Sequence, residues 1–440
     1  MRACALPHLA GTLGLWRVSE RRLASIRRRK LQRLLRHAYE NVAFYRSLWE
    51  RARVRPEEVD GPEDLVRLPV VSKEDLLSCR LEERLAQGID PSACWSSSSS
   101  GTTGHPLTVY TLPADRTRMN LGWFRAYLAN GLRVSETMAA FVGRRQVRTS
   151  QRWYERLGLF RRVEIPAWWS VEEWTAQLEL LRPAAITGYV MTLRLLAEHL
   201  RDHPHHRVHP RLVFHTSALL DEASRRLFEE QLKCRVVDLY GSEEAGCIAW
   251  ECPRCPGYHV NADLVVVEIL RNGVPARTGE AGEVVVTNLH SYAMPIIRYR
   301  QNDVASLAAT PPRCGWQFPL LERIEGRVED FLVLRDGRRL PPHPFYHCID
   351  PVPGVQRWRI VQDRPGEMTL EIVAEEEQSD AVRRAVLAGL AQLTGGAMDI
   401  ALHLVPEIPI DPRTKFRTIR SAVGALAPAE EWGATAKGGK

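Results

Sequence analysis

The chain has 440 residues, a net charge of +7 at pH 7, and a composition that is 45% hydrophobic and 26% charged. This length is too great for one ordinary hydrophobic core and predicts two or three domains, while the composition excludes wholesale disorder. No run of 18 apolar residues occurs, which argues against a membrane span, and we expect the N-terminal segment to belong to the mature chain.

The N-terminal part, residues 21–87, has a helical pattern in which Ser72 is the expected N-cap of a helix, with Asp75 three residues on. Its most basic stretch, RRLASIRRRKLQRLLRH, places apolar residues at helical spacing with arginines between them. We interpret it as a surface helix with one buried face rather than a nucleic-acid-binding element. The chain contains 54 arginines and only 6 lysines, so the basic charge is general and each lysine becomes informative.

The next part begins with a run of Ser, Thr and Gly, which leads into a β-prone stretch, LTVYTL. Strands and helices then alternate, which favours a largely parallel α/β sheet. The expected helices lie near 116–130, 171–181, 191–202 and 221–232, and the expected strands include 184–187, 212–217 and 235–241.

From Asp263 onward, DLVVVEIL, EVVVTNL and PIIRYR predict antiparallel strands, the first two joined by a tight turn at 271–273. Beyond Glu325 a small unit follows, with a hairpin at Asp336-Gly337, strands in VQRWRIVQ, MTLEIVAE and IALHLV, and a helix near 379–393. We therefore expect a large α/β body with an antiparallel β subdomain, over 1–325, and a small α+β unit, over 326–440.

Nine cysteines are scattered along the chain. An odd number in a long chain without an export signal indicates reduced thiols, and hence a cytoplasmic protein.

Three segments carry candidate chemistry. In SSGTTGHP the glycines let the backbone turn inward while hydroxyls and amides can donate to phosphate oxygens, although the spacing of a Walker loop is lacking. In DLYGSEEAG an aromatic ring follows a strand, where a purine could stack, and two carboxylates could ligate magnesium. Near the junction with the small unit lie Asp303, Arg298, Arg300 and Arg327, each of which alone would be interpreted as a solvated charge or an ion-pair partner.

These segments, in this order, resemble the adenylate-forming superfamily, and most closely its phenylacetate–CoA ligase-like and CapK-like branch. The resemblance covers nearly the whole chain and implies a mobile C-terminal domain. It implies that Tyr240 stacks on adenine, that Glu244 ligates Mg²⁺, and that Glu329 is the hinge. The ATP or AMP site that it implies comprises Ser99, Ser100, Gly101, Thr102, Thr103, Gly104, Ser217, Ala218, Asp238, Tyr240, Gly241, Asp303 for the ribose, and Arg327.

The resemblance also implies a catalytic lysine near the C-terminus, and Lys415 in PRTKFRT stands at its position. Attack of a carboxylate on the α-phosphate of ATP brings two anions together, so a positioned cation is required. Because the chain otherwise uses arginine almost everywhere, this lysine suggests that a compact ammonium group is needed.

The sequence departs from the family pattern at four positions: His105 replaces a lysine of the phosphate loop, Asn302 a glycine, Glu243 a hydroxyl residue and Leu219 a frequent glutamate. None of these changes removes a group with an obvious catalytic role.

A second kind of site is predicted by CIAWECPRCPGYH, in which Cys247, Cys252, Cys255 and His259 have the residue types that bind tetrahedral zinc. Four ligands leave no open coordination position, so we expect a structural Zn²⁺ ion.

The sequence thus predicts a ligase that activates an organic acid as an acyl-adenylate with release of pyrophosphate and passes it to a thiol, with CoA favoured. Aromatic acids are favoured by the resemblance alone. An amine, a carrier-protein pantetheine or a hydroxyl acceptor stays open, as does a homodimer. The rival hypothesis is a non-catalytic, zinc-containing protein that binds nucleotides or nucleic acid.

Overall fold

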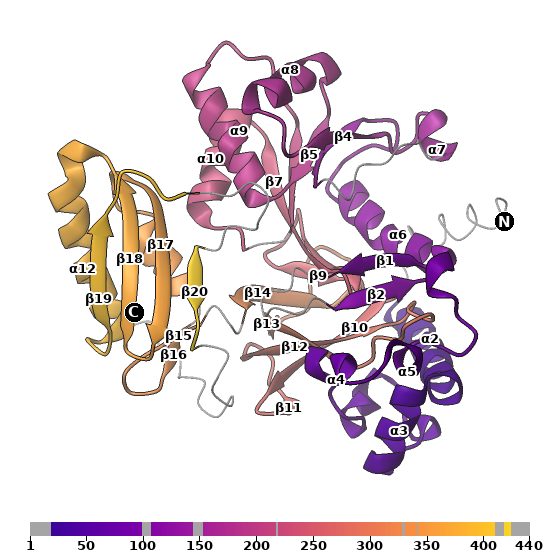
Figure 1. Cartoon of the computed structure of the whole chain (residues 1–440). Coiled ribbons are helices and arrows are strands. Elements are labelled where there is room, and N and C mark those ends of the chain that lie inside the picture. Colours follow the sequence, from indigo (N-terminus) through magenta and orange to yellow (C-terminus); the bar gives the residue numbers. More distant parts are fainter. Residues whose placement is uncertain are drawn as a thin grey trace. The chain divides into compact units, whose positions relative to one another are not determined.

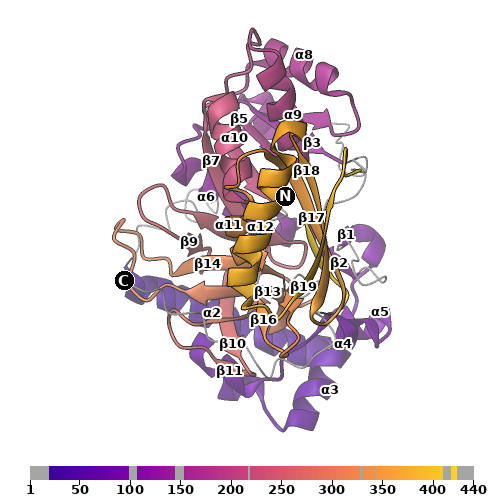
Figure 2. The same cartoon turned by 90° about the vertical axis from the view of Figure 1, so that its left-hand side faces the viewer.

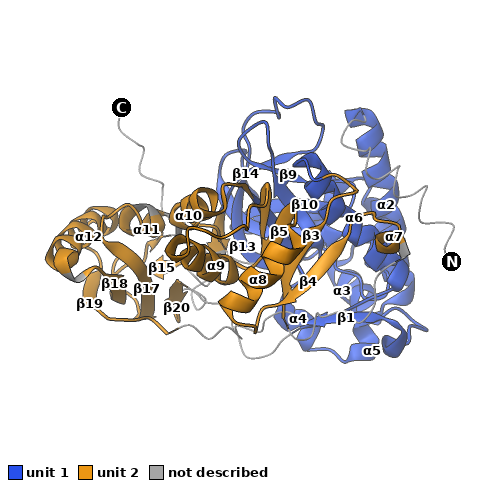
Figure 3. Ribbon diagram, turned by 90° about the horizontal axis from the view of Figure 1, so that it is seen from above, with its two compact units in different colours: residues 1–132, 237–324 blue, residues 133–236, 325–440 orange. Residues whose placement is uncertain are grey.

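The computed structural model describes residues 19–98, 107–143, 153–216, 219–327, 331–340, 342–409 and 418–423 (Figure 1). The chain divides into two compact units, each made of two stretches of sequence (Figure 3). Unit 1 comprises residues 1–132 and 237–324, and unit 2 comprises 133–236 and 325–440. Within the described ranges, none of the helices combines the length and apolar character needed to cross a bilayer.

Unit 1 begins with helices, as the N-terminal pattern predicts. Ser19 caps the first helix, and the predicted cap at Ser72 is confirmed because its hydroxyl accepts from the amide of Asp75 at 3.1 Å. The elements are α2 (Glu20–Asn41), α3 (Ala43–Ala52), α4 (Lys73–Leu77) and α5 (Leu81–Arg84), with short 3₁₀ turns at Pro56–Glu58, Pro62–Arg67 and Pro91–Ala93.

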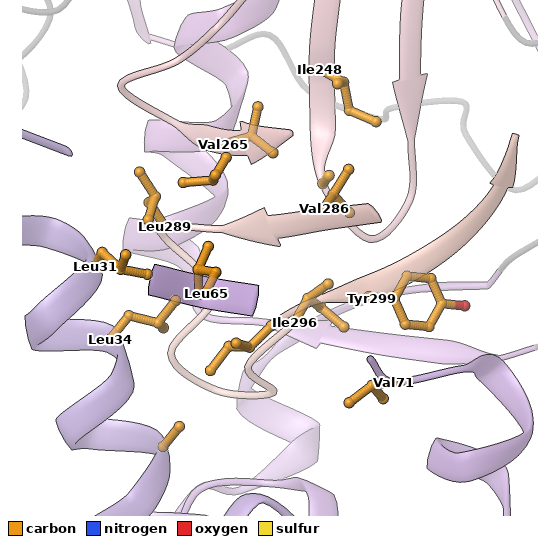
Figure 4. Packing of buried hydrophobic residues seen from close by; sticks show 14 of the residues in the cluster. Leu31, Leu34, Leu65, Val71, Ile248, Val265, Val286, Leu289, Ile296 and Tyr299 are labelled. Carbon is orange, nitrogen blue, oxygen red and sulfur yellow. The ribbon is translucent and has the colours of Figure 1, made fainter. Parts of the chain in front are cut away.

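The arginine-rich helix α2 buries one apolar face and leaves the arginines Arg21, Arg22, Arg28 and Arg29 exposed. Leu31 and Leu34 of α2 belong to the same hydrophobic cluster as Val265 and Val286 of the following sheet (Figure 4). The helix is therefore amphipathic, as its spacing predicts.

A β-sheet forms the second half of unit 1, with strand order β11-β10-β12-β13-β14-β9-β8-β7. The turn at Asn272-Gly273 joins β10 to β11, and both residues have positive φ, as a tight hairpin requires. The strands are β7 (Arg235–Ser242), β8 (Gly246–Glu251), β9 (Tyr258–Val260), β10 (Val265–Arg271), β11 (Val274–Pro275), β12 (Ala281–Asn288), β13 (Tyr299–Leu307) and β14 (Leu320–Arg327).

The serine-rich segment begins as a strand. β1 (Trp95–Ser98) pairs antiparallel with β2 (Thr108–Thr111), with Ser98 opposite Thr108. The residues on either side of 99–107, Ser98 and Thr108, are therefore strand partners. Helix α6 (Pro113–Ala129) follows directly.

The first part of unit 2 is a parallel sheet with the order β6-β5-β3-β4, and all of its neighbouring pairs are parallel. Its hydrophobic core lies between these strands and helices α8, α9 and α10. The elements are β3 (Met138–Val142), α7 (Trp153–Arg156), β4 (Arg162–Pro166), α8 (Val171–Leu181), β5 (Ala185–Gly188), α9 (Val190–Asp202), β6 (Leu212–Thr216) and α10 (Glu222–Leu232).

The C-terminal part of unit 2 has its own core and a sheet of order β19-β18-β17-β20. Helix α12 runs alongside this sheet and buries Val382, Val386 and Leu390 (Figure 2). The elements are β15 (Leu332–Val333), β16 (Arg339–Leu340), α11 (Pro342–Ile349), β17 (Val355–Arg364), β18 (Glu367–Ala374), α12 (Ser379–Thr394), β19 (Asp399–Leu404) and β20 (Ile419–Ser421). The expected mixed α/β fold with a small C-terminal α+β part is thus confirmed.

One outcome differs from the sequence-based expectations. The strand expected over PIIRYR starts only at Tyr299, because Arg298 has φ 48°, outside the extended region. The compact units also group the C-terminal part with residues 133–236, where Arg194 Nη2 donates to the carbonyl of Gln356 at 2.8 Å. The division into 1–325 and 326–440 stays a prediction.

Candidate functional site

The centre of the site in unit 1 is a hydrogen bond between two of the predicted nucleotide-binding residues. Tyr240 lies near the end of β7 and Asp303 lies on β13, and the Tyr240 hydroxyl donates to Oδ2 of Asp303 at 2.6 Å. Both side chains are half-buried. A hydrogen bond to a carboxylate is stronger than a neutral one, so it fixes the orientation of both groups.

Asp303 lies in a β-bulge. The pairing of β12 with β13 shifts register, because Glu283 faces Val304 whereas Val285 faces Arg300. Within this bulge Asn302 has φ 59°, in the left-handed region that glycine and asparagine adopt most readily. Asparagine therefore fulfils the conformational requirement for which the family pattern has glycine, and the bulge directs Asp303 toward Tyr240.

Glu244, the expected magnesium ligand, lies in the turn between β7 and β8 and is 7% exposed, whereas Glu243 is exposed. The Tyr299 hydroxyl donates to its Oε1 at 3.4 Å, and burial raises the pKa of the Glu244 carboxyl. A buried carboxylate is stabilised by a nearby cation, so this donor fits a divalent metal ion.

Two further residues of the DLYGSEE motif have roles in packing. A Cβ at Gly241 would lie 2.5 Å from the carbonyl oxygen of Gly246 and 2.8 Å from the Trp123 ring, so only glycine fits. Asp238 is buried and accepts a hydrogen bond from the Tyr258 hydroxyl at 2.9 Å.

The arginines at the start of β13 are ion-pair partners. Arg298 is buried, and its Nη2 lies 2.8 Å from Oε1 of Glu268, while it also donates to the carbonyl of Leu68. Nε of Arg300 lies 3.1 Å from Oε2 of Glu283. These contacts are those expected of structural arginines.

Several predicted site residues lie outside the described part of the chain. Leu219 and Leu220 directly follow two of these residues, Ser217 and Ala218, and they line a cavity of about 70 Å³ in unit 2. Arg327 is the last residue of β14, and its side chain is likewise not described. The residues outside the described ranges are Ser99, Ser100, Gly101, Thr102, Thr103, Gly104, His105, Ser217, Ala218, Glu329 and Lys415.

Unit 1 also contains a cluster of cysteine and histidine side chains. The ligand atoms of Cys252, Cys255, His259 and Cys314 all lie within 4.8 Å of one another. Cys252 and Cys255 belong to the β8–β9 hairpin, His259 lies on β9, and Cys314 lies in the β13–β14 loop. Three thiols and an imidazole in this arrangement match the donor set of a tetrahedral zinc site.

The structure corrects the predicted ligand set at one position. Cys247 does not join the cluster, because it lies on β8 with its thiol 3.8 Å from the carbonyl of Ala249 and is 1% exposed. Cys314 takes the fourth place, since β14 pairs with β9 and the loop before β14 returns to the hairpin.

Sequence reasoning missed Tyr299, Tyr258 and Cys314. No local pattern singles out the tyrosines, because their contacts depend on strand pairing. Cys314 had a signal, since it stands in PPRCGW among turn-forming residues, as the other two cysteines do in ECPRCPG.

Comparison with known proteins places these observations beside characterised relatives. The chain matches no protein-family model. It is 27% identical over 382 residues to the phenylacetate-coenzyme A ligase of Thermus thermophilus, covering 79% of this chain and 80% of that protein. It is 29% identical over 334 residues to the Escherichia coli phenylacetate-coenzyme A ligase, covering 72% and 74% respectively.

Solved structures show the same fold. The structure of 2-hydroxyisobutyryl-CoA ligase in the postadenylation state, in complex with an acyl-AMP, has a TM-score of 0.74 at 20% identity and covers 89% of this chain and 87% of its own. The anthranilate CoA ligase AuaEII in complex with anthranoyl-AMP has a TM-score of 0.56 at 15% identity, with 80% and 73% covered.

Proposed function

We propose that this chain, a member of the adenylate-forming superfamily and a homologue of phenylacetate–CoA ligases, is an ATP-dependent acid–CoA ligase. The superfamily resemblance drawn from the motifs is confirmed by these relatives and by the fold. The observation that carries the proposal is the hydrogen bond between Tyr240 and Asp303, beside the buried Glu244, because it assembles the motif residues of a nucleotide site.

The reaction has two steps. An oxygen of the acid's carboxylate attacks the α-phosphorus of ATP, the bond to the bridging oxygen breaks, and pyrophosphate leaves, which gives an acyl-adenylate. The thiol of CoA then attacks the acyl carbon, AMP leaves with the electrons of the acyl–oxygen bond, and the thiol proton passes to solvent.

In this proposal Tyr240 presents its ring to adenine and Asp303 accepts from the ribose hydroxyls. Glu244 would hold a magnesium ion, which neutralises phosphate charge when bound. Lys415 stabilises the negative charge that develops during adenylation. An aromatic acid is the proposed substrate class, because the curated relatives are named for phenylacetate.

The remaining parts of the proposal concern the ions and the setting. We include a structural zinc ion at the cluster of Cys252, Cys255, His259 and Cys314. A cytoplasmic location agrees with the free thiols of the eight cysteines in the described ranges. A homodimer is tested by light scattering of the purified chain.

The decisive experiment is ATP–pyrophosphate exchange across a panel of aryl and alkyl acids, followed by mass analysis of the products with CoA, amines and a pantetheine carrier. We expect acid-dependent exchange and an acyl-CoA product. If exchange occurs but the product is an amide or a carrier thioester instead of an acyl-CoA, then the acceptor is an amine or a carrier protein and not CoA. No exchange with any acid, together with salt-sensitive retention on nucleic acid, would refute the enzyme.

A variant pair tests the lysine. We expect Lys415→Ala to slow exchange by roughly 10²–10³-fold, the usual effect of removing a group that stabilises transition-state charge. Lys415→Arg should restore little, because a guanidinium group is larger and planar. The tail variant Lys437→Ala is the matched control and should exchange at the wild-type rate, whereas normal exchange in Lys415→Ala would exclude this residue from adenylation.

A further inference from the structure

The cysteine and histidine cluster of unit 1 joins segments that are distant in sequence. The β8–β9 hairpin supplies Cys252 and Cys255, β9 supplies His259, and the loop between β13 and β14 supplies Cys314. We infer that Cys314 completes a closed, four-coordinate zinc site that fastens the loop after the Asp303 strand to the hairpin after Glu244.

The distances in the cluster fit such an ion. The sulfurs of Cys252 and Cys255 are 3.4 Å apart, and Nε2 of His259 is 3.2 Å from the sulfur of Cys314. A regular tetrahedron with the usual zinc bond lengths has edges of about 3.8 Å between two sulfurs and about 3.6 Å between sulfur and nitrogen. These two separations are each about 0.4 Å shorter than the corresponding edges, and all four donor atoms lie within 4.8 Å of one another.

Neighbouring groups orient the ligands. Nδ1 of His259 lies 3.0 Å from the carbonyl oxygen of Phe318, which can only accept, so Nδ1 carries the proton and Nε2 offers its lone pair to the ion. The backbone amide of Arg254 donates to the sulfur of Cys252 at 3.4 Å, which fixes the position of this sulfur. Histidine ligands of metals usually have such a second partner.

Aromatic rings border the cluster, and its donor atoms favour zinc over other ions. The rings of Trp250, His259 and Trp316 lie 5.1 Å from one another, and Trp250 is fully buried. Three thiolates and one imidazole suit zinc better than the oxygen-seeking magnesium or calcium. Because all four positions are occupied by protein ligands, the ion stabilises unit 1 and activates no water.

The alternative ligand, Cys247, provides a matched control. It lies five residues before Cys252, on β8, yet its thiol lies 3.8 Å from the carbonyl oxygen of Ala249 and outside the cluster. Cys247→Ser therefore removes a buried sulfur outside the cluster, whereas Cys314→Ser removes a sulfur that belongs to it.

The first experiment measures the zinc content of the full-length protein and of three variants by inductively coupled plasma mass spectrometry. We expect about one equivalent in the wild type and in Cys247→Ser, and none in the Cys252→Ser/Cys255→Ser double variant. Cys314→Ser should bind zinc more than roughly 100-fold more weakly in a chelator competition, because loss of an outer-shell partner alone costs 10- to 100-fold. Full zinc affinity in Cys314→Ser, or loss of zinc in Cys247→Ser, would overturn the assignment.

A second measurement does not depend on the folding of Cys314→Ser. X-ray absorption at the zinc edge of the wild type and of Cys247→Ser should show three sulfur ligands and one nitrogen ligand in both proteins. Two sulfurs in Cys247→Ser, or wild-type protein that contains iron or no metal, would refute the site. These readouts need no substrate, so they fail or succeed independently of the proposed ligase activity.

Discussion

The backbone conformation of Asn302 allows a quantitative prediction about the nucleotide site. Asn302 has φ 59° and precedes Asp303, whose carboxylate accepts from the Tyr240 hydroxyl at 2.6 Å. Substitution by alanine places an ordinary L-residue in the left-handed region, which costs about 1–2 kcal/mol, whereas glycine adopts this region freely.

The size of this strain, compared with that of the neighbouring hydrogen bond, decides how the bulge responds. A hydrogen bond to a charged group contributes about 1.5–3 kcal/mol, which is similar to or greater than the strain. We therefore expect Asn302→Ala to keep its conformation and lose stability. Its melting temperature should fall by roughly 2–6 °C, and its KM for ATP should rise by less than about tenfold.

Two comparisons test this reasoning. In Asn302→Ala/Tyr240→Phe the hydrogen bond is absent, so the strain relaxes by displacing Asp303, and the KM for ATP should rise by more than the product of the two single effects. Asn272→Ala, at φ 52° in the exposed turn after β10, is the control and should lose similar stability without a change in KM. Differential scanning calorimetry and pyrophosphate exchange provide the measurements. An Asn302→Ala variant as stable as the wild type would refute the strain argument, and a KM rise far beyond tenfold would refute the strength assigned to the hydrogen bond.

Three further predictions concern buried charges. Arg125 and Asp263 are fully buried and form two hydrogen bonds with each other, at 2.6 and 2.9 Å. Because Arg125→Met leaves the Asp263 carboxylate buried without its charged partner, it should lower the free energy of unfolding of unit 1 by about 3–5 kcal/mol, measured by urea unfolding. Arg125→Met/Asp263→Leu should recover part of this loss, and no recovery would contradict the paired-charge explanation. Burial raises the pKa of Glu244, so the native state retains a proton that the unfolded state has lost. The free energy of unfolding of the wild type should therefore fall as the pH rises from about 4.5 through the raised pKa, and Glu244→Gln should lack this decline. At neutral pH, added Mg²⁺ should stabilise the wild type but not Glu244→Gln. Burial and the charge of Asp221 raise the pKa of Asp350 to about 7, so the free energy of unfolding of unit 2 should decrease between about pH 4 and 7. Asp350→Asn keeps an acceptor for the Trp358 indole and should remove this dependence of stability on pH. An unchanged pH dependence in this variant would show that another group titrates.

The sequence alone determined the features that depend on neighbouring residues. The serine cap at Ser72, the turn at Asn272-Gly273 and the alternation of strands and helices over 138–232 are local, because caps, turns and hydrophobic periodicity involve residues a few positions apart. The ordered motifs likewise sufficed to identify the superfamily, because their order along the chain is itself specific.

Tertiary structure decided what depends on the pairing of distant strands. Cys314 joins the cluster of cysteine and histidine side chains because β14 pairs with β9, and no spacing near Cys252 could exclude Cys247 in its favour. The contact of Tyr299 with Glu244 and the bulge that directs Asp303 toward Tyr240 have the same origin, since each is set by the register between strands. Register is a property of the whole sheet, so it is fixed only when the chain packs its core.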